Sequence, residues 1–376
     1  MSRPTSLNSR VLTVLLLVAL PVLLIGAGTV LGVGQGRLRE AQTAELRQVA
    51  SHTAAAVDAY VYRRILDAAL LGRVPDLRRA AADGNEQPFD QSRVAELDSQ
   101  WIADGAATAA RLGILTTPAS QFLADLVAHD SAYREVLVTD RYGRLVAASG
   151  ITSDYYQADE GWWYQAWDNG RGRVRVSDVG RDESAQVYAF EIAVPVPAPG
   201  GDGAAGVMKI VADSRETLAA IAGLEVGATA EAMLVRPDGS IVFRRRPHAP
   251  HDRFFAADLL RQGVADRAEA LAAPDAWSYE ARSPEGSLRV VAVAPSQLAQ
   301  SFPELRWLTV VSVERDELRA PFRSLVWYLV LVVLLTAVAV LAMALWLSLR
   351  LSEPPVDPAY NMHLVEHPPI HRVGEP

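Results

Sequence analysis

Two long uncharged apolar stretches constrain this chain of 376 residues more than any other feature. The first covers residues 11–33 and the second covers residues 325–349. As helices they would each extend roughly 35 Å, which exceeds the ~30 Å hydrocarbon core of a bilayer. We therefore predict two membrane helices that bracket an independent region, residues 34–324.

The first stretch has one alternative, a cleaved signal peptide. Its apolar core is longer than the ~7–15 residues usual for a signal peptide, and no clear cleavage site follows, so a retained anchor is favoured. Arginines flank both stretches on both sides, which makes the positive-inside signal weak. Because long domains translocate regardless of charge, we expect the central region outside a bacterial inner membrane. Residues 1–10 and 350–376 are then cytoplasmic.

The composition limits where the protein can be located in the cell and which partners it can bind. The chain has no cysteine, so no disulfide holds the exported region, which fits a bacterial periplasm. Its net charge is −8 and Lys209 is its only lysine, so we expect no nucleic-acid partner. Residues 350–376 are short and rich in proline, and we predict a disordered tail there with no cytoplasmic transmitter.

Residues 34–71 follow a helical pattern. Leu46, Val49, Val57, Val61 and Ile65 follow one another at spacings of three, four or eight residues, on one helical face. This pattern predicts a stalk of ~55 Å that continues the first membrane helix outward. An ordinary amphipathic core helix fits the same pattern, and one helix can serve as both.

From Tyr133 onward the residue pattern is typical of β-strands rather than helices. A strand, a turn at Gly143 and a returning strand come first, and further strands around residues 170–179, 186–196 and 206–213 complete a predicted five-strand antiparallel set. Helices around residues 101–112 and 120–129 precede it, with a loop or short-helix region at 72–100. The fold class expected is α+β, with a second, smaller module of the same kind behind it.

The segment between the first hairpin and the later strands is rich in aromatic side chains. Aromatic residues make up 7% of the chain, yet residues 153–167 contain six of them, Tyr155, Tyr156, Trp162, Trp163, Tyr164 and Trp167. Acids lie among them at Asp154, Asp159 and Glu160. Such amphipathic rings suit a pocket that binds a small polar molecule.

The ordered motifs resemble a known family. DRYGRLVAAS, SDYYQADEGWW, SDVGRDESAQVYAFEIAVPV and GVMKIVAD, after a membrane helix, together resemble the double Cache sensor domains of bacterial chemoreceptors and sensor kinases. The resemblance covers roughly residues 34–320. It implies a long N-terminal helix that carries two PAS-like modules, one distal (about 130–213) and one membrane-proximal (about 225–315). It also implies that ligands bind the distal module.

The resemblance further implies a set of ligand-binding residues. In the amino-acid-binding branch, a Tyr, an Arg, a Trp and an aromatic surround the ligand carboxylate, and a late Asp holds its ammonium. Tyr155, Trp162, Trp163 and Asp213 match these positions here, but Glu160 stands where the Arg is expected. Because Glu repels a carboxylate, an α-amino acid is disfavoured unless Arg173, Arg175 or Arg181 reaches in. A cationic ligand, such as an amine held over an aromatic ring, suits the set better.

Each of these residues also has a purely structural interpretation. Either tryptophan can be a core residue, Glu160 can cap a helix, and Asp213 can cap the segment that follows its strand. Tyr188 and Asp182 are further candidates for the rim of the pocket.

No motif for catalysis or for a cofactor is present. The histidines at 248 and 251 and those of the tail lack the pattern of a metal site, and we expect neither a metal nor a cofactor. The sequence therefore predicts a membrane-anchored sensor of a small polar ligand, not an enzyme. It would signal through its membrane helices to a separate protein or within a homodimer. The alternative is a ligand-free accessory or structural subunit of a membrane signalling complex.

Overall fold

The computed structural model describes most of the chain, namely residues 7–182, 187–201, 203–215, 219, 221, 223, 227–244, 275–283 and 286–350. The tail after residue 350, with its predicted disorder, and the histidines at 248 and 251 lie outside the described residues. Contacts divide the chain into two units, the terminal segments (residues 1–39 and 319–376) and residues 40–318.

Both apolar stretches lie in helices. The first is part of α1 (Leu7–Leu71), which runs without a break through Pro21 into the predicted stalk. The second is part of α9 (Arg315–Arg350). Each helix contains a segment long and apolar enough to cross a membrane, and the side chains of those segments are not buried within the protein.

The distal sheet has six antiparallel strands in the order β2-β1-β6-β5-β3, with β4 also paired to β5. The strands are β1 (Tyr133–Thr139), β2 (Leu145–Ala148), β3 (Arg175–Val176), β4 (Gly180–Asp182), β5 (Val187–Pro197) and β6 (Ala204–Asp213). The single strand predicted at 170–179 is wrong. Gly170 and Gly172 take positive φ values there, which breaks the extended backbone, so that only the two-residue β3 lies within this range and β4 begins after it, at Gly180.

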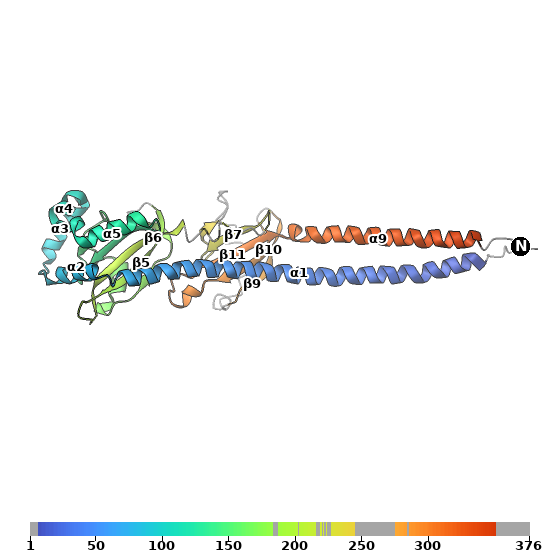
Figure 1. Ribbon diagram of the computed structural model, residues 1–376, viewed down its shortest axis with the longest axis horizontal. Helices are drawn as coiled ribbons and strands as arrows, with labels where there is room; N and C mark the ends of the chain where they lie inside the picture. Colours follow the sequence, from blue (N-terminus) through green and yellow to red (C-terminus); the bar gives the residue numbers. More distant parts are fainter. Residues whose placement is uncertain are drawn as a thin grey trace, which may run out of the picture. The chain divides into compact units, whose positions relative to one another are not determined.

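Helices cover both faces of this sheet (Figure 1). They are α2 (Pro75–Glu86), α3 (Gln91–Ala103), α4 (Gly105–Leu112), α5 (Pro118–His129) and α6 (Gly161–Trp167). One hydrophobic cluster joins α1, α2 and α5 to the sheet through residues such as Ile210, and another joins α3, α4 and α6 through residues such as Leu137. Because successive side chains of a strand point to opposite faces of the sheet, the residues of the two clusters alternate along strands such as β5. The region predicted as loop or short helix, 72–100, is largely helical, because Pro75 starts α2 and Asp90 caps α3.

The proximal sheet repeats this connectivity with five strands in the order β8-β7-β11-β10-β9. The strands are β7 (Glu231–Val235), β8 (Ile241–Arg244), β9 (Trp277–Arg282), β10 (Leu288–Pro295) and β11 (Leu308–Glu314). In both sheets the first hairpin lies at one edge and pairs next with the last strand. The two hairpin turns also match, since Gly143 and Gly239 both have φ of 83°. The predicted α+β class, with a long N-terminal helix and two antiparallel sheets, is confirmed.

The outer part of α1 packs along both sheets. Arg64 donates a hydrogen bond to Asp130 (3.1 Å) beside the distal sheet, and Asp58 accepts one from Ser296 (2.6 Å) beside the proximal sheet. Val57 and Val61 are buried in the core. The segment predicted as a stalk is therefore also a core helix.

A second set of contacts joins the two modules directly. Asp178, between β3 and β4, accepts a hydrogen bond from Trp307 Nε1 of the proximal module (2.7 Å) and forms an ion pair with Arg236. Arg236 also donates to the carbonyl of Val179 (2.8 Å). We call Asp178, Trp307 and Arg236 the module latch.

Candidate functional site

Trp163 is held by the core of the distal module. Its indole Nε1 donates to the buried Thr139 Oγ1 (2.8 Å), and its ring stacks on Trp167 with 5.5 Å between ring centroids. Thr139 in turn hydrogen-bonds to the backbone of Val207 on the neighbouring strand. Trp163 thus anchors α6 to the sheet, as its structural interpretation requires.

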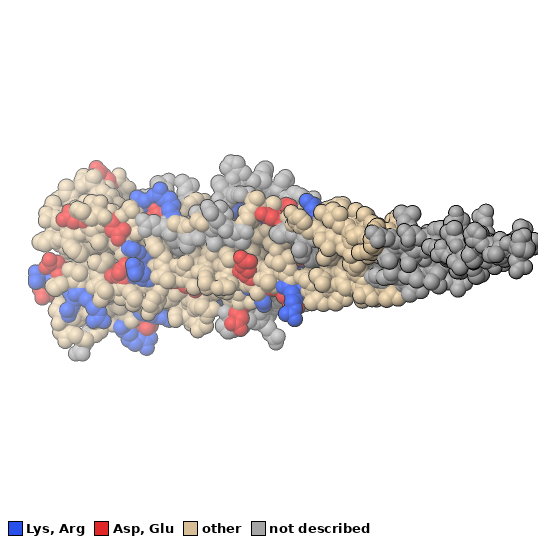
Figure 2. Space-filling view, turned by 45° about the vertical axis from the view of Figure 1, so that its right-hand side comes forward, with Lys and Arg blue, Asp and Glu red and all other residues tan. Residues whose placement is uncertain are grey.

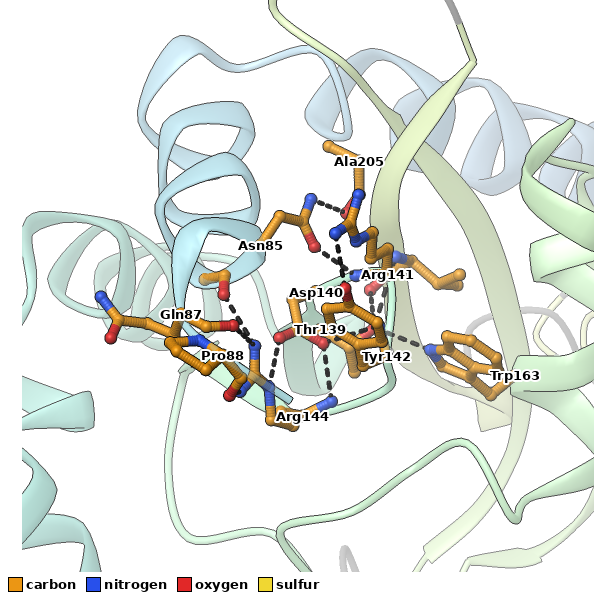
Figure 3. A network of polar contacts seen from close by, with 12 residues as sticks. Asn85, Gln87, Pro88, Thr139, Asp140, Arg141, Tyr142, Arg144, Trp163 and Ala205 are labelled. Carbon is orange, nitrogen blue, oxygen red and sulfur yellow. Dashed lines mark hydrogen bonds and ion pairs between the residues drawn. The ribbon is translucent and has the colours of Figure 1, made fainter. Parts of the chain in front are cut away.

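The same corner of the module contains a polar network around the β1–β2 turn (Figure 3). The buried guanidinium of Arg144 pairs with Asp140 (2.6 Å) and donates to the carbonyls of Gly84 (2.7 Å) and Pro88 (3.0 Å). These contacts tie the turn to the end of α2. We assign the network a structural role, because its charges and donors are occupied by one another.

Tyr155 is also largely internal. Its ring lies 6.1 Å from that of Trp101, and its backbone N–H donates to Asp98 Oδ1 (2.9 Å). Burial raises the pKa of its hydroxyl, so the side chain is neutral at physiological pH. Tyr155 also contributes to the lining of a cavity of about 600 Å³ between α2, α5 and the first hairpin.

Trp162 faces a charged cluster that sequence reasoning missed. The ammonium of Lys209 lies 5.1 Å from the centroid of its ring, within cation–π range. The same Nζ is 3.5 Å from Glu191 Oε1 and 3.9 Å from Glu135 Oε1. We call Lys209, Glu135, Glu191 and Trp162 the lysine cluster.

Strand register explains the cluster. Glu135 and Glu191 both pair with Val211, one from each side, and Lys209 lies two residues before Val211 on the same face of β6. Lys209 thus reaches diagonally to both acids. The side chains of Lys209 and Glu135 are each 10% exposed, so their charges interact with little screening.

Asp154 adds a third carboxylate. Burial raises its pKa to about 6, with further increases from the charges of Asp98, Glu160 and Asp159. The charge of Lys209 acts in the opposite direction. Lys209 therefore interacts with three carboxylates, those of Glu135, Glu191 and Asp154.

The two remaining positions near the segment are on the surface. Glu160 occupies the N-cap position of α6 but its side chain makes no capping hydrogen bond. Tyr188 is 64% exposed on β5. Both stay predictions as ligand contacts.

Asp213 is already paired with two arginines. Its Oδ2 accepts from Arg134 (2.6 Å) and Arg215 (2.8 Å), and its Oδ1 accepts from the backbone N–H of Arg215 (2.9 Å). Burial alone would raise the pKa of Asp213, but the hydrogen bonds from Arg215 and Arg134 lower it to about 2. The backbone contact is the capping role considered from the sequence.

The arginines considered as substitutes for the missing one lie elsewhere. Arg173 and Arg175 line a separate cavity of about 330 Å³ at the junction of the modules. The side chains of Arg181 and Asp182 lie outside the described part of the chain. The cation beside Trp162 is Lys209, and its status as the only lysine was the one available signal in the sequence.

Charges of both signs are interspersed on the face shown in Figure 2, with no extended basic surface among the described residues in that view. Within the described ranges, no group of three or more His, Asp or Glu residues could hold a metal ion.

No family model and no curated protein matches the chain. Solved structures similar to it include the ligand-binding domain of the amino acid chemoreceptor PctB of Pseudomonas aeruginosa in complex with L-Gln. That domain shows 19% identity and a TM-score of 0.43, over 73% of this chain and 92% of that one.

Two more similar structures come from other sensors. The sensory domain of the Campylobacter jejuni chemoreceptor Tlp3 shows 11% identity and a TM-score of 0.47, over 76% of this chain and 98% of that one. The extracellular domain of soHK1S-Z6, described as a histidine kinase, shows 16% identity and a TM-score of 0.46, over 77% and 99%. These structures are described as extracellular, sensory or ligand-binding domains of chemoreceptors and of a histidine kinase.

Proposed function

We propose that this protein is a membrane-anchored extracytoplasmic sensor whose distal module binds a small molecule bearing a cationic amine at the lysine cluster. The observation that carries the proposal is the position of the Lys209 ammonium, over the Trp162 ring and between two carboxylates. This is the environment that a ligand ammonium requires.

Charge supports the choice of a cation. Glu135, Glu191 and Asp154 gather around Lys209, so a ligand ammonium bound there would be attracted by several carboxylates. A ligand carboxylate would find Lys209 as its only partner in the cluster and would face three acids. Lys209 is also the side chain that moves if a ligand amine takes its position over Trp162.

The packing suggests a route for the signal. Ile210 and Ala212 alternate with the cluster face of β6 and pack into the hydrophobic cluster that contains Val57 and Val61 of α1. A small shift of β6 on binding would reach α1 through these contacts. The signal would then pass through the membrane helices to a separate partner or within a homodimer.

Calorimetry on the full-length protein in nanodiscs of uncharged lipid tests the ligand class. The panel contains primary and quaternary amines, carboxylates of matched size, and the amino acids named for the similar structures. We expect saturable heat from amines. Heat from carboxylates alone would reject the proposal.

Variants locate the site. Trp162→Leu and Glu191→Gln should each weaken amine binding by about tenfold or more, since each removes about 1.4 kcal/mol or more of contact energy. Glu96→Gln is the matched control, because Glu96 is an exposed acid with one ion pair on α3. Equal affinities in all three variants would place the ligand elsewhere.

A thermal shift separates a sensor from an accessory subunit. A ligand at 100 times its Kd stabilises the folded state by about 2.7 kcal/mol. If no member of a broad metabolite panel shifts the melting temperature, the accessory role is favoured instead.

A further inference from the structure

A second candidate site lies where the two modules meet. The cavity of about 330 Å³ there is within the size range of small-molecule pockets. The end of α6 and the start of β3 form its distal wall, and residues 301–304 form its proximal wall. It is separate from the lysine cluster, because none of the four cluster residues lines it.

The charges in the cavity favour an anion. Arg173 precedes β3 and Arg175 is its first residue, and both arginines line the cavity. Of the two acids in the lining, Asp168 is paired with Arg171 (2.9 Å), which leaves Glu304 against two guanidinium groups. The lining itself holds two arginines and two acids, and the exposed Arg171 beside Asp168 adds one further positive charge next to the cavity.

Arg175 is poorly satisfied where it stands. Its Nε is buried and has no hydrogen-bond partner, and its Nη1 lies 3.6 Å from Glu304, beyond a good hydrogen bond. Its hydrogen bond to the carbonyl of Val176 is long, at 3.4 Å. A guanidinium whose donors are only partly satisfied is a preferred partner of a carboxylate, which can accept two parallel hydrogen bonds.

We propose that this junction cavity binds a small dicarboxylate, with one carboxylate on the Arg175 fork and the other beside Arg173. Glu304 is the intrinsic competitor, since its carboxylate lies 3.6 Å from Nη1 of Arg175. Binding would bridge the two modules, because the ligand contacts both walls. This site does not depend on amine binding at the lysine cluster.

Titration of the full-length protein in nanodiscs of uncharged lipid tests the assignment. Succinate is the probe, phosphate tests for any dianion, and succinamide is the uncharged isostere. We expect saturable heat from succinate at millimolar concentration and none from succinamide. Binding of phosphate without succinate would overturn the carboxylate assignment, and binding of neither would overturn the site.

Two variants with opposite expected effects sharpen the test. Arg175→Gln should weaken succinate binding about 10- to 100-fold, as expected for lost hydrogen bonds to a charged group. Glu304→Gln should strengthen it about two- to fivefold, because a partly exposed competing charge is removed. Damage to the fold cannot produce this gain.

Controls keep the outcome decisive. Arg93→Ala removes another exposed arginine with a single acidic partner and should leave succinate binding unchanged. If Arg175→Gln lowers the melting temperature, Arg173→Gln and Glu304→Gln decide the matter. Succinate heat that both of these leave unaltered would overturn the proposal.

Discussion

Replacing Asp178 with alanine should remove the contacts that join the two modules at the module latch and so lower the stability of the folded protein. Asp178 is the acceptor for the Nε1–H of Trp307, which is 1% exposed, and the partner of Arg236. The substitution leaves the Trp307 donor buried without a partner, which costs about 1–3 kcal/mol. The ion pair adds about 0–1 kcal/mol, because both of its side chains are 30% exposed.

We therefore expect Asp178→Ala to destabilise residues 40–318 by about 1–4 kcal/mol. Urea unfolding of the full-length protein in nanodiscs, followed by tryptophan fluorescence, measures this loss. The matched control is Asp76→Ala, which removes an exposed acid paired only within its own helix and should cost less than about 0.5 kcal/mol.

A double-mutant cycle identifies the responsible contact. If the hydrogen bond to Trp307 carries the effect, Asp178→Ala should cost about 1 kcal/mol less in a Trp307→Phe background, where no donor is left unpaired. A coupling energy near zero, or a loss no larger than that of Asp76→Ala, would refute the latch.

The remaining predictions concern charge and backbone strain. Affinity for a cationic amine should rise with pH and level off above about 6, the pKa of Asp154, because the Asp154 carboxyl is uncharged at lower pH. In Asp154→Asn, the affinity measured by calorimetry should not change with pH over this range. Because the pKa of Asp213 is lowered to about 2 in the folded state, its carboxylate stabilises the fold above pH 3.8, the unfolded pKa, and this stabilisation is lost as the pH falls towards 2. Asp213→Asn should therefore make the melting temperature less dependent on pH between about 4 and 2. Gly143→Ala should cost about 2–4 kcal/mol in unfolding free energy, since its φ is 83° and a Cβ would lie 2.4 Å from Ala158 Cβ. Gly201→Ala, with φ of 93° and open space around it, should cost only about 1 kcal/mol, and equal losses would show that the contact with Ala158 is unimportant.

The sequence by itself determined the features that depend on local pattern. An uncharged apolar run is helical and long enough to cross a bilayer whatever surrounds it, and both runs lie in α1 and α9. The turn predicted at Gly143 follows from a residue that accepts a positive φ, and Gly239 takes the same φ of 83° in the matching hairpin. The strand-like patterns after Tyr133, together with the helical patterns before it, were then enough to predict the α+β class.

Only the tertiary structure decided what each side chain of the aromatic segment contacts. Trp162 and Trp163 are adjacent in sequence, yet one lies beside Lys209 and the other donates to Thr139, because neighbouring helix positions point about 100° apart. Lys209, Glu135 and Glu191 come from three strands and meet through register, which no local pattern reveals. Long-range strand pairing brought the charges of the candidate site together, and so only the fold could place them.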